Sequence, residues 1–296
     1  MKYGILNLFK PIGPTSRDCV NRLVKPLRPS KVAHAGTLDP LAQGVLLILV
    51  GPAVRLMDEI HELDKEYVAG FTLGQRSPSG DLETECESVP MQMEFDRNTI
   101  QDAMTRFLGP IVQVPPTYSA IRVNGKRAHA SARRGTEVHM PPRTIMIHEL
   151  DSLEYEHPRI RVRIRCSTGT YIRTLGSDLA KSLGTDAVMT ELTRVRVGPF
   201  RIEASRSLES VQDHFSGACL DPPIAALKHW EHWSVDDVVM RRILDGQHLA
   251  DNEVLSTSQT RLAVLDSRET LRAILKKRPD GTWRCDKGIA HWDVFP

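Results

Sequence analysis

The sequence is poor in cysteine and has none of the cysteine pairs that bind zinc or carry out thiol redox chemistry. Its 296 residues include five cysteines, an odd number, and no two of them are spaced as Cys-x-x-Cys. A disulfide framework and a cysteine-type zinc site are therefore disfavoured, and a reducing cytoplasm is the expected location. The eleven histidines show no His-x-x-x-His spacing, so we expect no metal chemistry.

Long hydrophobic runs are also missing from the sequence. The longest, at 45–50, is far shorter than the roughly 17–25 residues of a membrane-spanning helix. Lys2 is followed by no sustained apolar stretch before Pro11, so we expect neither a secretory signal nor a membrane anchor. With 41% hydrophobic and 26% charged residues, the composition is that of a globular protein with one large domain or two.

The sequence lacks a glycine-rich dinucleotide loop and a regular alternation of strands and helices. We expect Ser16 and Asp96 to cap helices and 31–41 to be a loop. Apolar periodicity predicts a further helix at 171–183 and strands at 3–9, 44–51, 66–73, 144–156, 159–166 and 192–200. Intermixed elements of this kind favour an α+β fold with a mixed, mainly antiparallel sheet.

Charge is nearly balanced overall but unevenly distributed. The formal net charge is +2, yet residues 1–57 carry eight basic and two acidic side chains, and residues 121–206 carry sixteen and nine. A basic face for a polyanion and pairing with acidic segments both fit this pattern. Four arginines alternate with apolar residues along 159–166, so a row of like charges should lie on one strand face. Either acidic strands or an RNA backbone must lie opposite that row.

The most informative segment for chemistry is 34–46, His-Ala-Gly-Thr-Leu-Asp-Pro-Leu-Ala-Gln-Gly-Val-Leu. Asp39 lies there between small residues and a proline, on an irregular segment just before a buried strand. Loops held by a rigid scaffold often carry catalytic groups, but Asp-Pro is also an ordinary start of a turn. The residues alone leave both interpretations open.

Segment 34–46 resembles the catalytic motif of the TruB-type tRNA pseudouridine synthases. Five further segments resemble that family's motifs in the same order: Lys-Pro-Ile-Gly-Pro-Thr-Ser at 10–16, Lys-Glu-Tyr at 65–67, Pro-Pro-Thr-Tyr-Ser-Ala at 115–120 continued by Gly-Lys-Arg-Ala at 125–128, Cys-Ser-Thr-Gly-Thr-Tyr-Ile-Arg at 166–173, and the closing strand at 192–200. The resemblance covers residues 3–210, and six ordered matches are hard to explain by chance.

The resemblance implies an isomerase that converts uridine to pseudouridine at position 55 in the T loop of tRNA. No electrons, phosphate or water are consumed in this reaction, so no cofactor is expected. The implied fold is an α+β pseudouridine-synthase-type catalytic domain, residues 1–222, followed by a small β-rich, PUA-like RNA-binding module, residues 223–296. The expected partner is the T stem-loop of tRNA, bound by a monomer without an obligatory protein partner or a membrane.

The resemblance also implies roles for individual residues. Asp39 would be the nucleophile, attacking either C1′ or the base C6, and the Arg173 guanidinium would keep its carboxylate ionised. Tyr67 would stack on the flipped base and help to remove the C5 proton. Tyr171 and Leu192 would complete an apolar pocket for the base.

The remaining implied contacts are with the RNA outside the base pocket. His34 would lie near the extruded nucleotide. The backbone phosphates would be contacted by basic side chains, namely Lys10, Arg122, Lys126, Arg127, Arg133 and Arg134. Three positions depart from the family pattern in ways that bear on RNA contacts: Phe9 replaces a frequent acid, Arg122 a frequent lysine and His129 a usual tyrosine.

Two other functions fit parts of the sequence. A non-catalytic protein that binds or folds tRNA would need only the basic segments and the C-terminal module. A metal-free glycoside hydrolase would need a second acid beside Asp39, and the sequence offers no convincing one.

Overall fold

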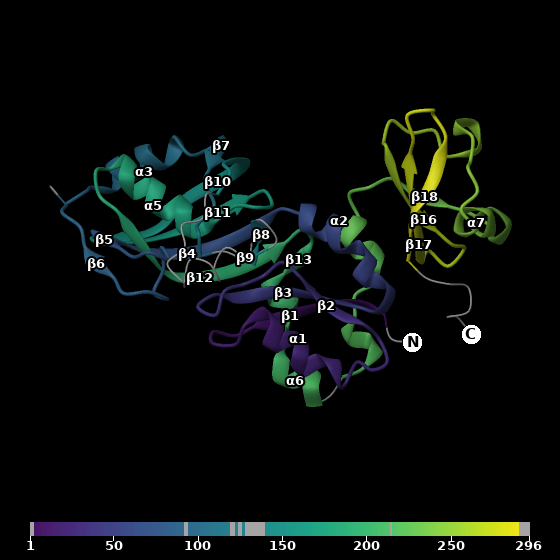
Figure 1. Ribbon diagram of the computed structural model, residues 1–296, viewed down its shortest axis with the longest axis horizontal. Helices are drawn as coiled ribbons and strands as arrows, with labels where there is room; N and C mark the ends of the chain where they lie inside the picture. Colours follow the sequence, from purple (N-terminus) through teal and green to yellow (C-terminus); the bar gives the residue numbers. More distant parts are fainter. Residues whose placement is uncertain are drawn as a thin grey trace.

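The computed structural model describes residues 3–91, 94–118, 122–123, 126–127, 140–213 and 215–289, with 122–123 and 126–127 described by their backbone alone. Figure 1 shows a long, curved sheet with helices on its faces, and a smaller sheet set to one side of it. The helices are α1 Ser16–Val24, α2 Met57–Glu62, α3 Arg97–Thr105, α5 Ile172–Ser182, α6 Leu208–Asp213 and α7 Asp237–Leu244, and the 3-10 turns are η1 Gly51–Leu56, η2 Ile202–Ala204, η3 Gly217–Cys219, η4 Pro223–Leu227 and η5 Asp251–Glu253.

The large sheet has ten strands in the order β14-β1-β3-β12-β4-β11-β10-β7, with β2 beside β3 and β13 beside β12. Only β1 with β14 and β3 with β12 pair in parallel, which confirms the mixed, mainly antiparallel sheet expected from the sequence. Its strands are β1 Gly4–Lys10, β2 Val32–Ala35, β3 Gln43–Val50, β4 Lys65–Leu73, β7 Gly109–Gln113, β10 Arg143–Glu156, β11 Arg159–Cys166, β12 Ala187–Val197, β13 Phe200–Arg201 and β14 Arg206–Ser207.

Three smaller sheets complete the described strands. Two are two-stranded, β5 Gln75–Arg76 with β6 Glu87–Ser88, and β8 Arg122–Val123 with β9 Lys126–Arg127. The third has the order β15-β16-β17-β18, formed by His232–Ser234, Arg261–Leu265, Leu271–Lys277 and Trp283–Gly288. It shares a hydrophobic cluster with the large sheet, which includes Val45 and Leu47 of β3 and Leu271 and Ile274 of β17. The two parts of the chain are therefore packed against each other.

Strand β3 shows why an apolar run without alternation can be a strand. Its odd-numbered side chains, Val45, Leu47 and Leu49, join one core cluster, and its even-numbered ones join another beneath α1 and α6. Both faces of the strand are covered, so both need apolar residues.

Two local expectations for the N-terminal region were wrong. Thr15, not Ser16, caps α1, and it does so in a reciprocal capping box with Asp18. Segment 31–41 is not entirely a loop, because 32–35 forms β2 along β3. Short strands at a sheet edge are set by the neighbouring strand rather than by their own pattern.

The arginine row on β11 faces acidic side chains. Arg163 lies 2.9 Å from Glu66 on β4, and Arg165 lies 2.7 Å from Glu149 on β10. Arg161 similarly approaches Glu154 at 3.5 Å. Acidic side chains on neighbouring strands, the first of the two expected alternatives, thus lie opposite three of the four arginines.

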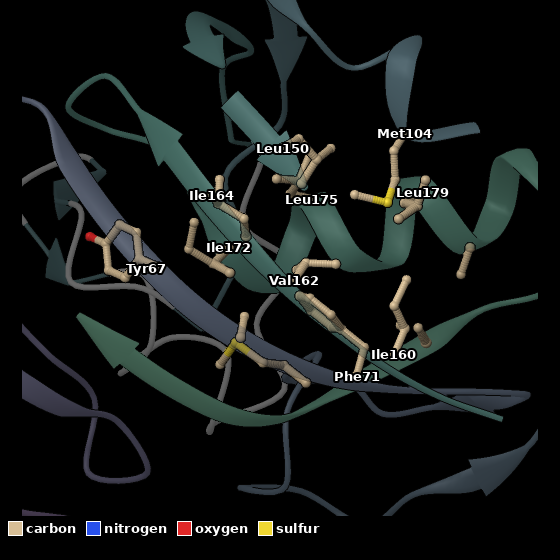
Figure 2. Packing of buried hydrophobic residues seen from close by; sticks show 14 of the residues in the cluster. Tyr67, Phe71, Met104, Leu150, Ile160, Val162, Ile164, Ile172, Leu175 and Leu179 are labelled. Carbon is tan, nitrogen blue, oxygen red and sulfur yellow. The ribbon is translucent and has the colours of Figure 1, made fainter. Parts of the chain in front are cut away.

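A third core cluster lies between the sheet and helices α3 and α5, and Figure 2 shows how its side chains interlock. Helix α5 approaches β4 closely because residue 176 is a glycine. A Cβ built there would lie 2.0 Å from the ring of Phe71. Non-bonded carbon atoms cannot pack at that distance, so the close contact of α5 with Phe71 depends on residue 176 having no side chain.

We predict that Gly176→Ala lowers the free energy of unfolding by about 1–3 kcal/mol, because overpacking at Phe71 outweighs alanine's gain of up to about 1 kcal/mol in helix propensity. Urea denaturation followed by circular dichroism measures the change. Lys181→Ala on the same helix is the control and should change stability by less than about 0.5 kcal/mol. A stabilised Gly176→Ala protein would show that α5 is not held this close to β4.

Candidate active site

The loop that carries Asp39 is held from one side by the segment before α1. The backbone N–H of Gly13 donates to the Pro40 carbonyl at 2.9 Å. The buried Ser16 hydroxyl accepts from the Leu38 N–H at 2.8 Å and donates to the Leu38 carbonyl at 2.9 Å. Two segments that are separate in the sequence therefore form one rigid unit around Asp39.

Lys10 belongs to this unit and is not available to RNA. Its side chain is completely buried, and its ammonium donates to the carbonyls of Ala42 at 2.7 Å and Pro11 at 3.0 Å. Burial lowers the pKa of Lys10, an effect that nearby Asp39 opposes. The expected phosphate contact of Lys10 is thus corrected to a structural contact with the loop that carries Asp39.

Arg194 on β12 holds the same loop from the other side. Its guanidinium donates to the carbonyls of Val45 at 2.7 Å and Gly36 at 3.0 Å. Gly44 allows this approach: its φ is +106°, and a Cβ there would lie 2.2 Å from the Arg194 carbonyl oxygen. Only glycine fits where β3 and β12 come together.

Arg173, at the start of α5, makes the central contact of the site. Its side chain is 5% exposed, and one terminal nitrogen lies 3.2 Å from the Asp39 carboxylate. The other terminal nitrogen lies 3.2 Å from the carboxylate of Asp81. The same two nitrogens donate to the carbonyls of Ser79 and Tyr118, both at 2.9 Å. The structure brings Asp39 and Arg173 together as the sequence predicted, and it adds a second carboxylate.

Asp81 was missed in the sequence because nothing local distinguishes it from other acids in the polar segment 77–90. It is 1% exposed, and its carboxylate also accepts from the backbone N–H of Glu83 at 3.0 Å. The hydroxyls of Ser77 and Ser79 donate to its carbonyl at 2.6 Å and 3.1 Å. This buried loop fixes the inner carboxylate behind Arg173.

The two carboxylates differ in exposure and therefore in what they can do. The Asp39 side chain is 41% exposed, whereas that of Asp81 is 2% exposed. Surrounding protein still removes enough water to raise the pKa of Asp39, and the charges of Asp81 and Glu83 raise it further. Arg173 opposes that rise and so favours the ionised form. Only Asp39 is placed to meet a ligand.

Five of the predicted residues line one pocket of about 360 Å³: Asp39, Tyr67, Arg173, Tyr171 and Leu192. They come from the 36–42 loop, β4, β12 and the start of α5. The volume falls within the range of small-ligand sites. A carboxylate beside aromatic and apolar walls suits a flat, neutral ring.

Tyr67 links the pocket to the core. Its ring lies at one end of the hydrophobic cluster, with the hydroxyl directed away from the other labelled side chains (Figure 2). Burial raises the pKa of Tyr67, and the charge of Arg194 opposes that rise. The hydroxyl is therefore neutral at pH 7. It could accept a proton from a ligand only if it released its own proton at the same time.

His34 lies on β2 and is not one of the pocket-lining residues, whereas His61 is. The His34 Nδ1 atom is buried and has no hydrogen-bond partner in the described part of the chain. Burial and the charges of Arg194 and Arg17 lower the pKa of His34, so the ring is neutral at pH 7. The place of His61 at the end of α2 was not foreseen.

Of the predicted basic contacts beyond the pocket, Arg122, Lys126 and Arg127 are placed only by their backbone. Arg122 pairs with Arg127 in the two-stranded sheet of β8 and β9, and Lys126 belongs to the same sheet. Arg133, Arg134 and His129 lie outside the described residues. In the described ranges, no three His, Cys, Asp or Glu side chains are grouped so as to hold a metal ion, and no described helix is long and apolar enough to cross a membrane.

The mixed sheet thus presents one loop carboxylate, held by a buried arginine, beside a small pocket. A solved structure described as a Cbf5-Nop10-Gar1 complex aligns with the whole of this chain and 87% of its own, with a TM-score of 0.77 and 26% identity. A family model for the N-terminal domain of TruB family pseudouridylate synthases matches residues 24–172, and one for the C-terminal domain of tRNA pseudouridylate synthase B matches 173–227.

Curated relatives agree with these matches along most of the chain. The tRNA pseudouridine synthase B of Bacillus licheniformis is 36% identical over 294 residues, covering 95% of each protein. That of Clostridium acetobutylicum is 38% identical over 252 residues, covering 85% of this chain and 87% of its own. The chain belongs to the TruB family of pseudouridylate synthases, and it is an isomerase of the tRNA pseudouridine synthase class.

The unequal burial of the two carboxylates predicts opposite effects on stability. Asp81→Asn should lower the free energy of unfolding by about 1–3 kcal/mol, because it removes the inner charge partner of a buried guanidinium. Asp39→Asn should leave stability unchanged or raise it at pH 7. The folded state raises the pKa of Asp39, so ionising this carboxyl above its unfolded pKa works against folding.

Urea denaturation of both variants at pH 7 measures this difference. Asp102→Asn, at an exposed position of α3, controls for the loss of one negative charge. A larger loss of stability in Asp39→Asn than in Asp81→Asn would contradict the assignment of a structural inner carboxylate and a functional outer one.

Proposed function

We propose that this protein isomerises uridine to pseudouridine at position 55 in the T loop of tRNA, with Asp39 as nucleophile on a flipped-out uridine. The observation that carries the proposal is the Asp39–Arg173 contact at 3.2 Å, beside a pocket that Tyr67, Tyr171 and Leu192 also line. Relatives named tRNA pseudouridine synthase B, alignable over almost the whole chain, support tRNA as the substrate.

The proposed reaction needs one carboxylate and no consumed reagent. The N1–C1′ bond breaks, the base turns, C5 joins C1′, C5 loses its proton and N1 gains one. Asp39 attacks a carbon of the nucleotide as positive charge develops there, either C1′ or C6 of the base. Arg173 keeps Asp39 in its anionic form and holds its oxygen in place.

The second carboxylate does not favour hydrolysis. Glycosidases place two carboxyl groups on either side of the scissile bond so that one can direct water. Asp81 lies behind the Arg173 guanidinium and is 1% exposed, so it cannot reach a sugar in the pocket. Isomerisation, which must avoid water, fits this arrangement better than hydrolysis.

The other pocket residues serve extraction and orientation of the base. Flipping a uridine out of a folded loop costs a few kcal/mol, which stacking on Tyr67 and Tyr171 and contact with Leu192 offset. The Tyr67 hydroxyl relays the C5 proton. Arg122, Lys126 and Arg127 contact the RNA backbone, and His34 lies near the extruded nucleotide.

We further propose that residues 1–222 form the catalytic domain and 223–296 a PUA-like RNA-binding module. The separate four-stranded sheet that begins at β15 supports this division. We also propose that the protein acts as a monomer without an obligatory protein partner. The free state of all five cysteines supports a cytoplasmic location.

Site-resolved mapping of pseudouridine in unmodified tRNA tests the proposal. We expect the wild-type protein to form pseudouridine at position 55, and Asp39→Asn to lose at least about 10³-fold in rate because the nucleophile is gone. Asp102→Asn, which removes an exposed carboxylate that does not line the pocket, should keep full activity. Binding of the same tRNA to Asp39→Asn should persist.

Three results would count against the proposal in different ways. Modification at another site by the wild type would overturn the position. Activity that survives Asp39→Asn would overturn the nucleophile. Wild-type protein that binds tRNA without modifying it would favour a tRNA-folding role.

A further inference from the structure

Arg143, the first residue of β10, lies in the wall of the pocket, and no part of the proposed mechanism uses it. The centre of its guanidinium lies 4.8 Å from the centre of the Tyr171 ring, over the ring face. One terminal nitrogen donates to the carbonyl of Gly169. The side chain is therefore held in a fixed position beside the aromatic wall of the pocket.

The local backbone is shaped to receive this side chain. Gly169 has a φ of +83°, and a Cβ there would lie 3.4 Å from the guanidinium carbon of Arg143. Gln113 pairs with Arg143 across β7 and β10, and its side-chain amide bonds both the N–H and the carbonyl of Tyr171, at 2.7 Å and 3.1 Å. Arg143 and Tyr171 are thus both positioned by β10 and its neighbour β7.

The other described arginines and the lysine of the pocket each have at least two hydrogen-bond or ion-pair partners. Arg173 faces two carboxylates. Arg194 donates to three backbone carbonyls, and the Lys65 ammonium donates to those of His61 and Leu63. Arg143 has one carbonyl and a ring face, no carboxylate partner among the described residues, and a buried Nε without a hydrogen-bond partner.

We propose that Arg143 binds a phosphate that flanks the flipped uridine, which makes it a substrate-binding residue of the pocket. The inference rests on the proposed function, because it takes an RNA nucleotide as the ligand. Uracil is neutral and cannot compensate a guanidinium, whereas the nucleotide brings a phosphate on each side of the base into the mouth of the pocket. An arginine with free donors and a fixed plane suits such a bidentate anion.

The first test measures binding of an unmodified T stem-loop against salt concentration, with every protein carrying Asp39→Asn so that no turnover occurs. Arg143→Gln should weaken binding by about 10-fold or more, as expected for loss of hydrogen bonds to a charged group. It should also reduce the slope of log K against log salt by about 1. Arg143→Lys keeps the charge and should keep the slope.

Gln113→Ala is the matched control, because it loosens Tyr171 without removing a charge. It should leave the salt slope unchanged even where affinity falls. An Arg143→Gln protein with the parental slope would overturn the proposal, whatever its affinity, because Arg143 would then act only through Gly169 and Tyr171. Melting temperatures of all variants show whether each is folded, and Arg143→Met, a second neutral variant of similar length, supplies the test if Arg143→Gln is not.

A second test locates the phosphate. A stem-loop with an uncharged methylphosphonate on the 5′ or the 3′ side of the target uridine should bind the parental protein more weakly at one of these positions. That loss should shrink at least about fivefold in Arg143→Gln, since the partner is already gone. Equal losses in both proteins would contradict the contact. Failure of the wild type to modify tRNA would instead refute the proposed function, and is measured separately.

Discussion

The ion pairs of the buried Arg173 guanidinium are the interactions on which the active site depends. The Arg173 side chain is 5% exposed and lies between two carboxylates, each 3.2 Å away. A buried charge costs several kcal/mol unless it is paired and hydrogen-bonded, and Arg173 meets this requirement with Asp81 and two backbone carbonyls. Its remaining contact can then be given to Asp39, which faces the pocket. The contact with Asp81 stabilises the buried Arg173 guanidinium, and the guanidinium in turn positions the Asp39 carboxylate.

The motifs of the family have a common structural explanation at this site. The 10–16 segment holds the Asp39 loop through Gly13, Ser16 and Lys10, and Arg194 from the closing strand holds it from the opposite side. The 115–120 segment contributes the Tyr118 carbonyl that receives Arg173. Segments far apart in the sequence are thus joined by hydrogen bonds around a single carboxylate.

Elements with a strong apolar pattern could be predicted from the sequence, and residues defined by tertiary contacts could not. Strands β3 and β11 and the Asp96 cap of α3 followed from periodicity and capping chemistry. Lys10 was misjudged because a motif gives a residue type but not its exposure, and this lysine is entirely buried. Asp81 gave no signal because its role arises only when the 77–90 segment folds over the start of α5.

Titration of the Asp39 carboxyl most directly tests the claim that Arg173 controls this group. The carbon-13 resonance of the carboxyl, assigned by its loss in Asp39→Asn, would be followed against pH in the wild type and in Arg173→Lys. Since Arg173 lowers the pKa of Asp39 against the effect of burial, the midpoint should move to higher pH when the guanidinium is replaced by an ammonium that cannot reach both carboxylates. A midpoint that stays in place or moves to lower pH would contradict the account.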